Sequence, residues 1–202
     1  MATSNTIAVF DFDHTLVHHD SFWAFMALVA GWPKTIMAFI QSLATLAQKY
    51  IQNPNDPNVR DYRTFLKDQL LKRLLAGRAI KDLAPAIEQL HGWQRWNDGV
   101  RKNLLDHHAQ GHHIVVASGG LDLYLHELLK DTPINALICT AVGVKDGFVT
   151  GEMVSGNCVR LRKAEMVASY MQQHGPFLNS WGYGNLPHDL PMLALVRHRI
   201  II

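Results

Sequence analysis

Near the start of the chain, an apolar run leads directly into two aspartates, and this stretch limits the folds available. Ile7 to Phe10 is short and rich in strand-forming residues, Asp11 follows it, and Asp13 comes one residue later. A continuous apolar run of this length is typical of a strand buried on both faces, as in a parallel sheet. Ligands of open α/β sheets bind beyond the carboxyl ends of the strands, so Asp11 would stand at the mouth of a site.

Two carboxylates at a strand end favour two chemical uses and one structural use. They can hold a hard cation such as Mg²⁺ through oxygen atoms. Asp11 can also attack phosphorus, while Asp13 donates a proton and later accepts one. Alternatively, the pair ends the strand and caps a helix, as aspartates often do. The pair by itself leaves all three open.

Composition predicts a folded chain with a substantial core. The 202 residues are 48% hydrophobic and 18% charged, and the net charge of +2 gives no electrostatic reason to expect nucleic acid as a partner.

Cys139 and Cys158 form no C-x-x-C pair, which favours a reducing compartment without disulfides. The segment from Met1 to Thr6 is short and polar, unlike a secretory signal, so we expect a cytoplasmic protein that could associate with a membrane.

A long apolar and helical insertion follows the first motif, from Val17 to Trp96. Phe22 to Trp32 and Thr35 to Ile51 are apolar stretches separated by a Gly-Trp-Pro-Lys break, which predicts two packed helices rather than one membrane span. The alternative is a surface that faces a membrane or lipid. Further helices are predicted over Val59 to Ala76 and Ala79 to Leu90.

The second half of the chain repeats the pattern of a buried strand followed by small or polar residues. Ser118 and Gly119 follow one apolar strand, and Asn185 and Asp189 follow another, while Lys163 lies near the start of a predicted helix. An Asp-Gly pair at Asp146 predicts a β-hairpin. Predicted strands are His113–Ala117, Ile134–Val142, Phe177–Tyr183 and Arg199–Ile202, and predicted helices are Asn97–Gln110, Leu121–Lys130 and Arg162–His174.

Together these motifs resemble those of the haloacid dehalogenase superfamily of aspartate-nucleophile phosphatases. Asp11-Phe12-Asp13-His14-Thr15 matches its D-x-D-x-T motif, Ser118 its second motif, Lys163 its third and Gly184 to Asp189 its fourth. The position of the helical insertion resembles the phosphoserine-phosphatase-like branch, subfamily IB. The resemblance implies a Rossmann-like three-layer α/β core with a parallel sheet (1–16 and 97–202), an all-helical cap inserted after the first strand (17–96) and a small β-hairpin flap.

The resemblance also implies an activity: Mg²⁺-dependent hydrolysis of a phosphate monoester through an aspartyl phosphate. Asp11 would be the nucleophile, Asp13 the general acid and base, and Lys163 the cation that neutralises charge between nucleophile and phosphate. The residues implied in phosphate binding are Thr15, Ser118 and Gly119. The residues implied as Mg²⁺ ligands are Asp11, Asp13, Asn185 and Asp189.

The chain departs from the family pattern at the fourth motif. Asn185 stands where the family usually has Asp, and Leu186 where it has Ser or another small residue. An asparagine keeps an oxygen ligand but removes one negative charge from the metal cage. We therefore expect an active site with weakened affinity for Mg²⁺.

The substrate is the least determined part of this interpretation. Asp20 lies where phosphoserine phosphatases carry an acidic residue that contacts the substrate amine, which favours an amino-bearing phosphate monoester. Arg60 and Arg63 are candidates for binding a substrate carboxylate. The apolar insertion also permits a lipid phosphate of the phosphatidylglycerophosphate type and contact with a membrane surface. The same motifs are compatible with a phosphotransferase and with a catalytically weak regulatory module that binds phosphate, and the oligomeric state is open.

Overall fold

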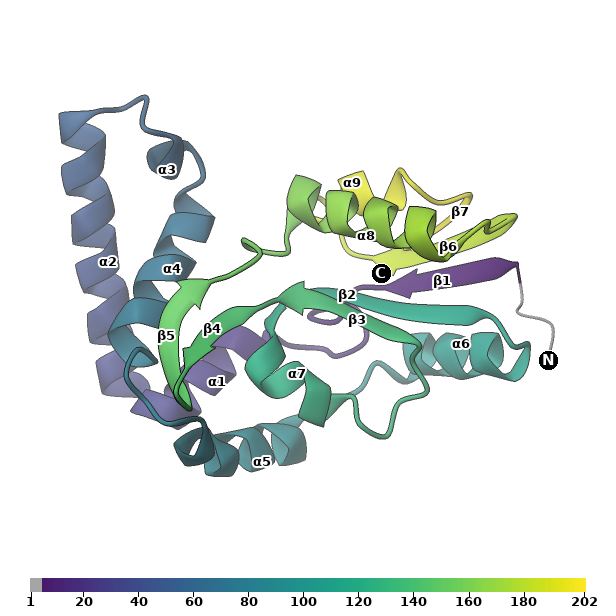
Figure 1. Cartoon of the computed structure of the whole chain (residues 1–202), viewed down its shortest axis with the longest axis horizontal. Helices are drawn as coiled ribbons and strands as arrows, with labels where there is room; N and C mark the ends of the chain where they lie inside the picture. The colour runs from purple at the N-terminus through teal and green to yellow at the C-terminus, as the bar shows by residue number, and fades with distance from the viewer. Residues whose placement is uncertain (1–4) are drawn as a thin grey trace. The chain divides into compact units, whose positions relative to one another are not determined.

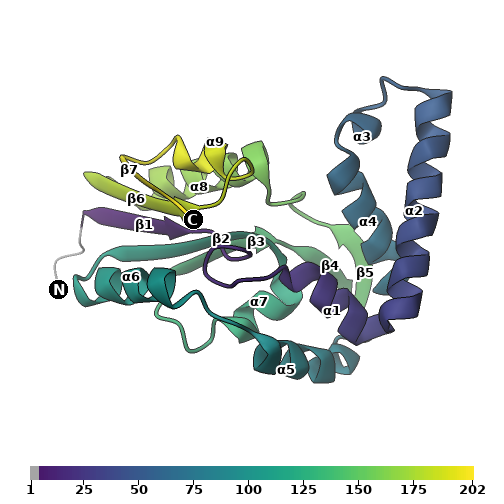
Figure 2. The ribbon, with the colours of Figure 1, turned by 180° about the vertical axis from the view of Figure 1, so that it is seen from behind.

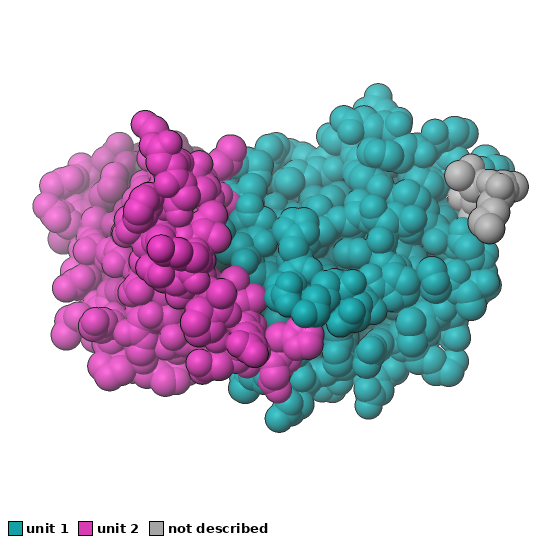
Figure 3. All heavy atoms as spheres, turned by 60° about the horizontal axis from the view of Figure 1, so that its bottom comes forward, with its two compact units in different colours: residues 1–21, 93–141, 155–202 teal, residues 22–92, 142–154 magenta. Residues whose placement is uncertain are grey.

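The computed structural model describes residues 5–202, which form two compact units (Figure 3). The sheet unit comprises residues up to 21, 93–141 and 155–202, and the helical unit comprises residues 22–92 and 142–154. The predicted limits of core and cap stay a prediction, although the hairpin that we expected in the core belongs to the helical unit. The first four residues of the polar segment Met1 to Thr6 lie outside the described residues.

Within residues 5–202, the sheet unit contains a five-stranded parallel sheet in the order β3-β2-β1-β6-β7. The strands are β1 (Thr6–Phe10), β2 (His113–Leu121), β3 (Ala136–Thr140), β6 (Asn179–Gly184) and β7 (His198–Ile201). Ile7 of the central strand β1 is level with His113 on one side and Ser180 on the other. Because β1 is covered on both faces, its apolar residues from Ile7 to Phe10 are fully buried, as predicted.

Helices cover both faces of this sheet (Figures 1 and 2). On one face lie α6 (Asp98–Ala109) and α7 (Asp122–Leu128), and on the other α8 (Arg160–His174) and α9 (Leu190–Leu193). The core includes Val9, Val115 and Val167, so it joins the sheet to α8. This arrangement confirms the predicted three-layer α/β fold.

The helical unit is built from helices and one hairpin. Its helical elements are α1 (Ser21–Ala30), α2 (Trp32–Gln52), α3 (Pro57–Arg60), α4 (Tyr62–Leu74), the 3₁₀ turn η1 (Ile80–Leu83) and α5 (Ala84–Trp93). The first residue of α1, Ser21, and the last residue of α5, Trp93, belong to the sheet unit. The predicted hairpin is confirmed as β4 (Val142–Lys145) and β5 (Phe148–Met153), turning at Asp146 and Gly147, which both have positive φ. Gly151 brings β5 against α4, because a Cβ there would lie 2.9 Å from the Lys72 Cα.

Among the helix limits that differ from those predicted, two have a clear physical reason. The break between α1 and α2 falls at Gly31, whose φ of 82° suits glycine, and Pro33 sits in the first turn of α2, where proline is tolerated. The helix predicted over Val59 to Ala76 is two helices, because Asp61 caps α4 by accepting a hydrogen bond from the Thr64 N–H. No single helix of residues 5–202 is long and apolar enough to cross a membrane, although α1 and α2, bent by 114°, meet that criterion as a pair.

Candidate active site

The site lies where the order of the strands reverses. From β1 the chain passes to β2 on one side, and later to β6 on the other, so the crevice between β1 and β6 is open at their carboxyl ends. Asp11 follows β1 directly, and its N–H donates to the Tyr183 carbonyl at 2.9 Å. Asn185 follows β6 in the same way. The sheet thus brings residues 174 positions apart to one edge.

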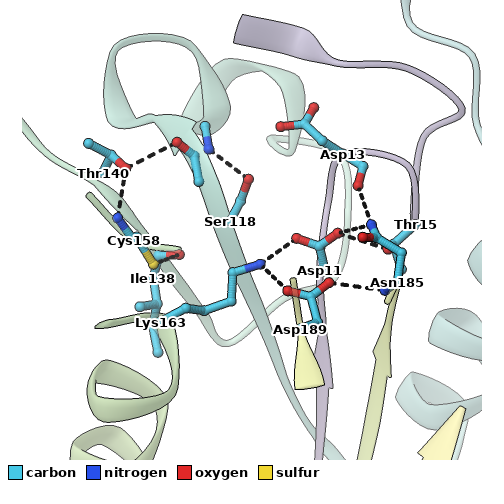
Figure 4. A network of polar contacts seen from close by, with 12 residues as sticks. Asp11, Asp13, Thr15, Ser118, Ile138, Thr140, Cys158, Lys163, Asn185 and Asp189 are labelled. Carbon is cyan, nitrogen blue, oxygen red and sulfur yellow. Dashed lines mark hydrogen bonds and ion pairs between the residues drawn. The ribbon is translucent and has the colours of Figure 1, made fainter. Parts of the chain in front are cut away.

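Lys163 is the central cation of the site (Figure 4). It lies in the first turn of α8, and its ammonium donates to Asp11 Oδ1 at 2.6 Å and to Asp189 Oδ1 at 2.7 Å. All three side chains are buried. Burial lowers the pKa of Lys163, but the two carboxylates outweigh that effect and raise it above its ordinary value. Lys163 is therefore a permanent positive charge between two acids.

Both carboxylate oxygens of Asp11 are held. Lys163 binds Oδ1, and the Thr15 hydroxyl donates to Oδ2 at 2.8 Å. Burial raises the pKa of the Asp11 carboxyl, while the Lys163 ammonium lowers it in part. The side chain is thus fixed in orientation, in a position with little water, directly beside a cation.

The Asp13 carboxyl has a different environment. Its Oδ1 accepts a hydrogen bond of 2.8 Å from the Ser21 N–H at the start of α1, so it does take the capping role considered from the sequence. Burial, followed by the charge of Asp20, raises the pKa of Asp13 to about 7. A carboxyl with that pKa holds a proton in a large fraction of molecules at neutral pH, as a general acid requires.

Asn185 lies against the first motif through its side-chain amide. Its Nδ2 donates to the Asp13 main-chain carbonyl at 3.1 Å and contacts Asp11 Oδ2 and Thr15 Oγ1, each at 3.3 Å. Its main-chain N–H donates to Asp189 Oδ2 at 3.0 Å. Asp189 is therefore held at both oxygens, by Asn185 and by Lys163.

Comparison with known proteins assigns the chain to a family. The sequence profile of haloacid dehalogenase-like hydrolases matches residues 8–194. The chain belongs to that family. Its predicted membership and its predicted standing as a hydrolase are therefore confirmed.

Individual relatives are distant. Protein CicA of Caulobacter vibrioides is 26% identical over 198 residues, which are 94% of this chain and 82% of CicA. A Bordetella pertussis protein of unknown function has a similar structure, with a TM-score of 0.76, 21% identity, and coverage of 98% of this chain and 90% of that one. A phosphoserine phosphatase described as a phospho-aspartyl intermediate analogue has a TM-score of 0.63 and 18% identity, covering 98% of this chain and 86% of that one. These structures share the fold.

Three of the residues predicted to bind Mg²⁺ lie close together. The Asp11 carboxylate and the Asp13 main-chain carbonyl both lie within 3.3 Å of the Asn185 amide nitrogen. Half a turn of that amide would present its oxygen in place of the nitrogen. Among residues 5–202, no three His, Cys, Asp or Glu side chains are grouped as metal ligands. An all-oxygen set of carboxylate, carbonyl and amide suits Mg²⁺, so the residues fit the ion that the family implies.

The second motif differs from the sequence prediction in its backbone. We expected the strand to end at Ala117, but β2 continues through Ser118 and Gly119 to Leu121, with an irregularity in its pairing to β3. The expected helix follows as α7, one residue later than predicted. Ser118 is fully buried, and its Oγ accepts a hydrogen bond from the Gly120 N–H at 2.9 Å. Phe10 is level with Val116, so Ser118 lies at the same edge as Asp11, one strand away. This position suits the predicted phosphate contact, which stays a prediction.

Two contributors to the site were not identified from the sequence. Thr140, at the end of β3, donates from its hydroxyl toward the Gly119 carbonyl at 3.0 Å and accepts from the Cys158 N–H at 3.0 Å. A polar residue that ends an apolar strand was the available signal for it. Tyr124 is fully buried, and its hydroxyl lies 2.9 Å from Ser21 Oγ. Burial raises the pKa of Tyr124 well above its ordinary value, so its hydroxyl is neutral where it contacts Ser21, the residue whose N–H donates to Asp13.

The predicted substrate residues are less constrained. Asp20 is half-buried beside Ser21, and its charge acts on Asp13. Arg60 is exposed and donates to Asn55 Oδ1 at 3.1 Å, and the Arg63 guanidinium carbon lies 5.9 Å from the centroid of the Tyr62 ring. Their roles toward a substrate stay predictions.

Proposed function

We propose that this chain is a phosphatase that hydrolyses a phosphate monoester through an aspartyl phosphate on Asp11. One observation carries the proposal: a buried carboxylate at a strand end is held at one oxygen by Lys163 and at the other by Thr15. A carboxylate that serves only to balance a lysine does not need a second acid such as Asp13 nearby with a pKa of about 7. Membership of a hydrolase family supports the same activity.

In the first step, an Asp11 oxygen attacks phosphorus while the bond from phosphorus to the ester oxygen breaks. Asp13 gives its proton to the leaving alcohol and becomes a carboxylate. In the second step, Asp13 takes a proton from water, whose oxygen bonds to phosphorus as the bond to Asp11 breaks. Inorganic phosphate leaves, and both aspartates return to their starting states.

The transferring group carries negative charge that must be balanced before reaction. Lys163 supplies one positive charge next to Asp11, and Thr15, Ser118 and the Gly119 backbone are proposed to donate to the phosphoryl oxygens. Mg²⁺, held by Asp11, the Asp13 carbonyl and Asn185 with Asp189 nearby, would add the remaining positive charge when bound. Because Asn185 contributes no charge, we infer weaker Mg²⁺ binding than an aspartate at this position would give.

Two substrate classes remain as proposals. Asp20, near Asp13, favours a phosphate monoester that carries an amine. The exposed apolar side chains of α2 favour a lipid phosphate instead. If an alcohol replaces water in the second step, the enzyme is a phosphotransferase, and if neither step occurs, the chain is a phosphate-binding regulatory module.

Release of inorganic phosphate from p-nitrophenyl phosphate across a Mg²⁺ titration tests the proposal. We expect metal-dependent turnover in the wild type and in Asp131→Asn, a matched control at an exposed position. Asp11→Asn should lose at least about 10³-fold in rate, because the amide is a poor nucleophile. Turnover that survives in Asp11→Asn would contradict the mechanism, and silence of the wild type at all Mg²⁺ concentrations would favour the regulatory module. A panel with phosphoserine and lipid phosphates would then separate the substrate classes.

A further inference from the structure

Helix α2 carries its large apolar side chains on the outside of the helical unit. Six of them, here called the outer face, are between 40% and 59% exposed: Trp32, Ile36, Met37, Ile40, Leu43 and Tyr50. At about 3.6 residues per turn, they fall within about 140° of the helix surface. An amphipathic helix normally turns this stripe toward a core. Here it faces solvent.

The opposite side of α2 explains why the core does not need these side chains. Thr35, Ala38 and Ser42 are the buried residues of α2, and all three are small. The Ser42 hydroxyl donates to the Ala38 carbonyl at 2.7 Å, so its hydrogen bond is satisfied within α2 and needs no acceptor on a neighbouring helix. Small side chains on this side suit the close packing of α2 against α4. The outer face is thus surplus to the fold, and such exposed apolar patches mark interaction surfaces.

Charge points to the kind of partner. The segment of residues 21–52, which forms α1 and α2, contains Lys34 and Lys49 and no aspartate or glutamate. Lys34 is exposed near one end of α2, whereas Lys49 near the other end is half-buried and pairs with Asp56 at 3.8 Å, so the charge that α2 offers to a partner is chiefly that of Lys34. A cationic segment with an apolar stripe complements a surface that is apolar beneath and negatively charged at its boundary.

The ends of the outer face have the residues that a membrane boundary favours. Trp32 and Tyr50 lie at the two ends of the stripe, about 27 Å apart along the helix axis. Their rings combine an apolar body with a polar atom, as do interfacial aromatic residues. A polar band that includes Lys34, Gln41 and Gln48 runs alongside the stripe, so α2 suits lying along a surface rather than crossing it.

We propose that the outer face of α2 binds the surface of a membrane that contains anionic lipids. The stripe extends along α2 from Trp32 to Tyr50, and a lipid surface accepts it without a complementary groove. The proposal concerns binding and does not depend on the proposed phosphatase activity. A second copy of the chain packed on the same face is the competing occupant, and the experiment separates the two.

The test is co-sedimentation with vesicles of phosphatidylcholine and phosphatidylglycerol in equal parts, compared with phosphatidylcholine alone. The wild type should bind the anionic vesicles more tightly, and less so at high salt. Ile36→Gln combined with Ile40→Gln should lower the partition coefficient by at least about tenfold, since two apolar side chains are lost from the contact. Leu178→Gln, at an exposed apolar position of the sheet unit, is the matched control and should bind as the wild type does.

The outcomes are decisive in both directions. Loss of binding in the double variant alone, with circular dichroism and unfolding midpoint unchanged, supports the proposal. Absence of wild-type binding to either vesicle overturns it, and sedimentation equilibrium then shows whether a dimer that the double variant disrupts occupies the face instead. Equal loss of binding in Leu178→Gln would overturn the assignment to α2.

Discussion

Replacing Asn185 by aspartate should make the stability of the protein dependent on a divalent cation. In the wild type, the Asn185 amide donates toward the Asp11 carboxylate, the Asp13 carbonyl and the Thr15 hydroxyl. Aspartate puts an acceptor in place of this donor. Without a cation, the new carboxylate faces Asp11 as a like charge, and with a cation the two become ligands of one ion.

The structure gives the size of the effect. The Asn185 Nδ2 lies 3.3 Å from Asp11 Oδ2. Two negative charges at that separation repel by about 5 kcal/mol at an effective dielectric constant of about 20, before movement and water reduce the value. The Lys163 ammonium, 2.6 Å from Asp11 Oδ1, offsets part of this repulsion. We therefore expect the free energy of unfolding of Asn185→Asp in EDTA to be lower than that of the wild type by about 1–3 kcal/mol.

Urea unfolding in EDTA and in Mg²⁺ measures this directly, without reference to activity. Mg²⁺ should raise the unfolding midpoint of Asn185→Asp more than that of the wild type, since binding to the folded state stabilises it by mass action. Leu186→Ser is the matched control, because it restores the other departure from the family pattern at an exposed side chain. It should respond to Mg²⁺ as the wild type does. Equal midpoints in EDTA for Asn185→Asp and the wild type, with equal shifts in Mg²⁺, would refute the reasoning.

Three further predictions concern other parts of the sheet unit. Lys163→Met leaves Asp11 and Asp189 buried without their cation. This variant should therefore lose turnover, and urea melts should show a free energy of unfolding lower by about 3–5 kcal/mol. A variant as stable as the wild type would contradict this prediction. Burial, with a smaller effect from a neighbouring histidine, lowers the pKa of His107 to about 4. The folded state therefore keeps His107 neutral. The contribution of neutral His107 to the free energy of unfolding is complete above about pH 6.5 and decreases as the pH drops toward 4. The loss should be about 2 kcal/mol at pH 5 and should be smaller in His107→Gln, and equal pH profiles in urea melts would exclude the effect. Gly184→Ala would place a Cβ 2.8 Å from the Asp189 carboxylate, which would have to move. The rate of phosphate release should therefore fall at least about tenfold, while the circular dichroism spectrum stays unchanged. A wild-type rate in this variant would show that the position of Asp189 does not affect turnover.

Local signals in the sequence predicted individual elements of the scaffold, whereas the three-layer fold with its inserted cap was predicted from the family resemblance. The run from Ile7 to Phe10 predicted a central buried strand, because a short segment that is apolar on both faces is typical of a strand covered on both sides of a parallel sheet. The Asp-Gly pair at Asp146 predicted its hairpin because the turn needs positive φ. The family motifs placed Lys163 in the site, and its ammonium contacts Asp11 and Asp189, while its catalytic role stays a prediction.

What could not be predicted depends on long-range packing. Tyr124 meets Ser21 across 103 positions, and no periodicity relates the two. The continuation of β2 past Ser118 depends on pairing with β3, which a local interpretation of Ser-Gly-Gly as a turn does not include. The apolar stretch from Thr35 to Ile51 predicted a helix but not which of its sides is packed, because small residues such as Ser42 can also form the packed side of a helix.

The central claim is that Asp11 becomes phosphorylated during turnover. Acid quenching of the wild type during hydrolysis of p-nitrophenyl phosphate, followed by peptide mass spectrometry, tests it most directly, because an acyl phosphate survives acid and is cleaved by hydroxylamine. We predict the mass of one phosphoryl group on the peptide that contains Asp11, lost on hydroxylamine treatment and absent in Asp11→Asn. Steady turnover with no phosphoryl group on that peptide, or with the group on another residue, would contradict the account.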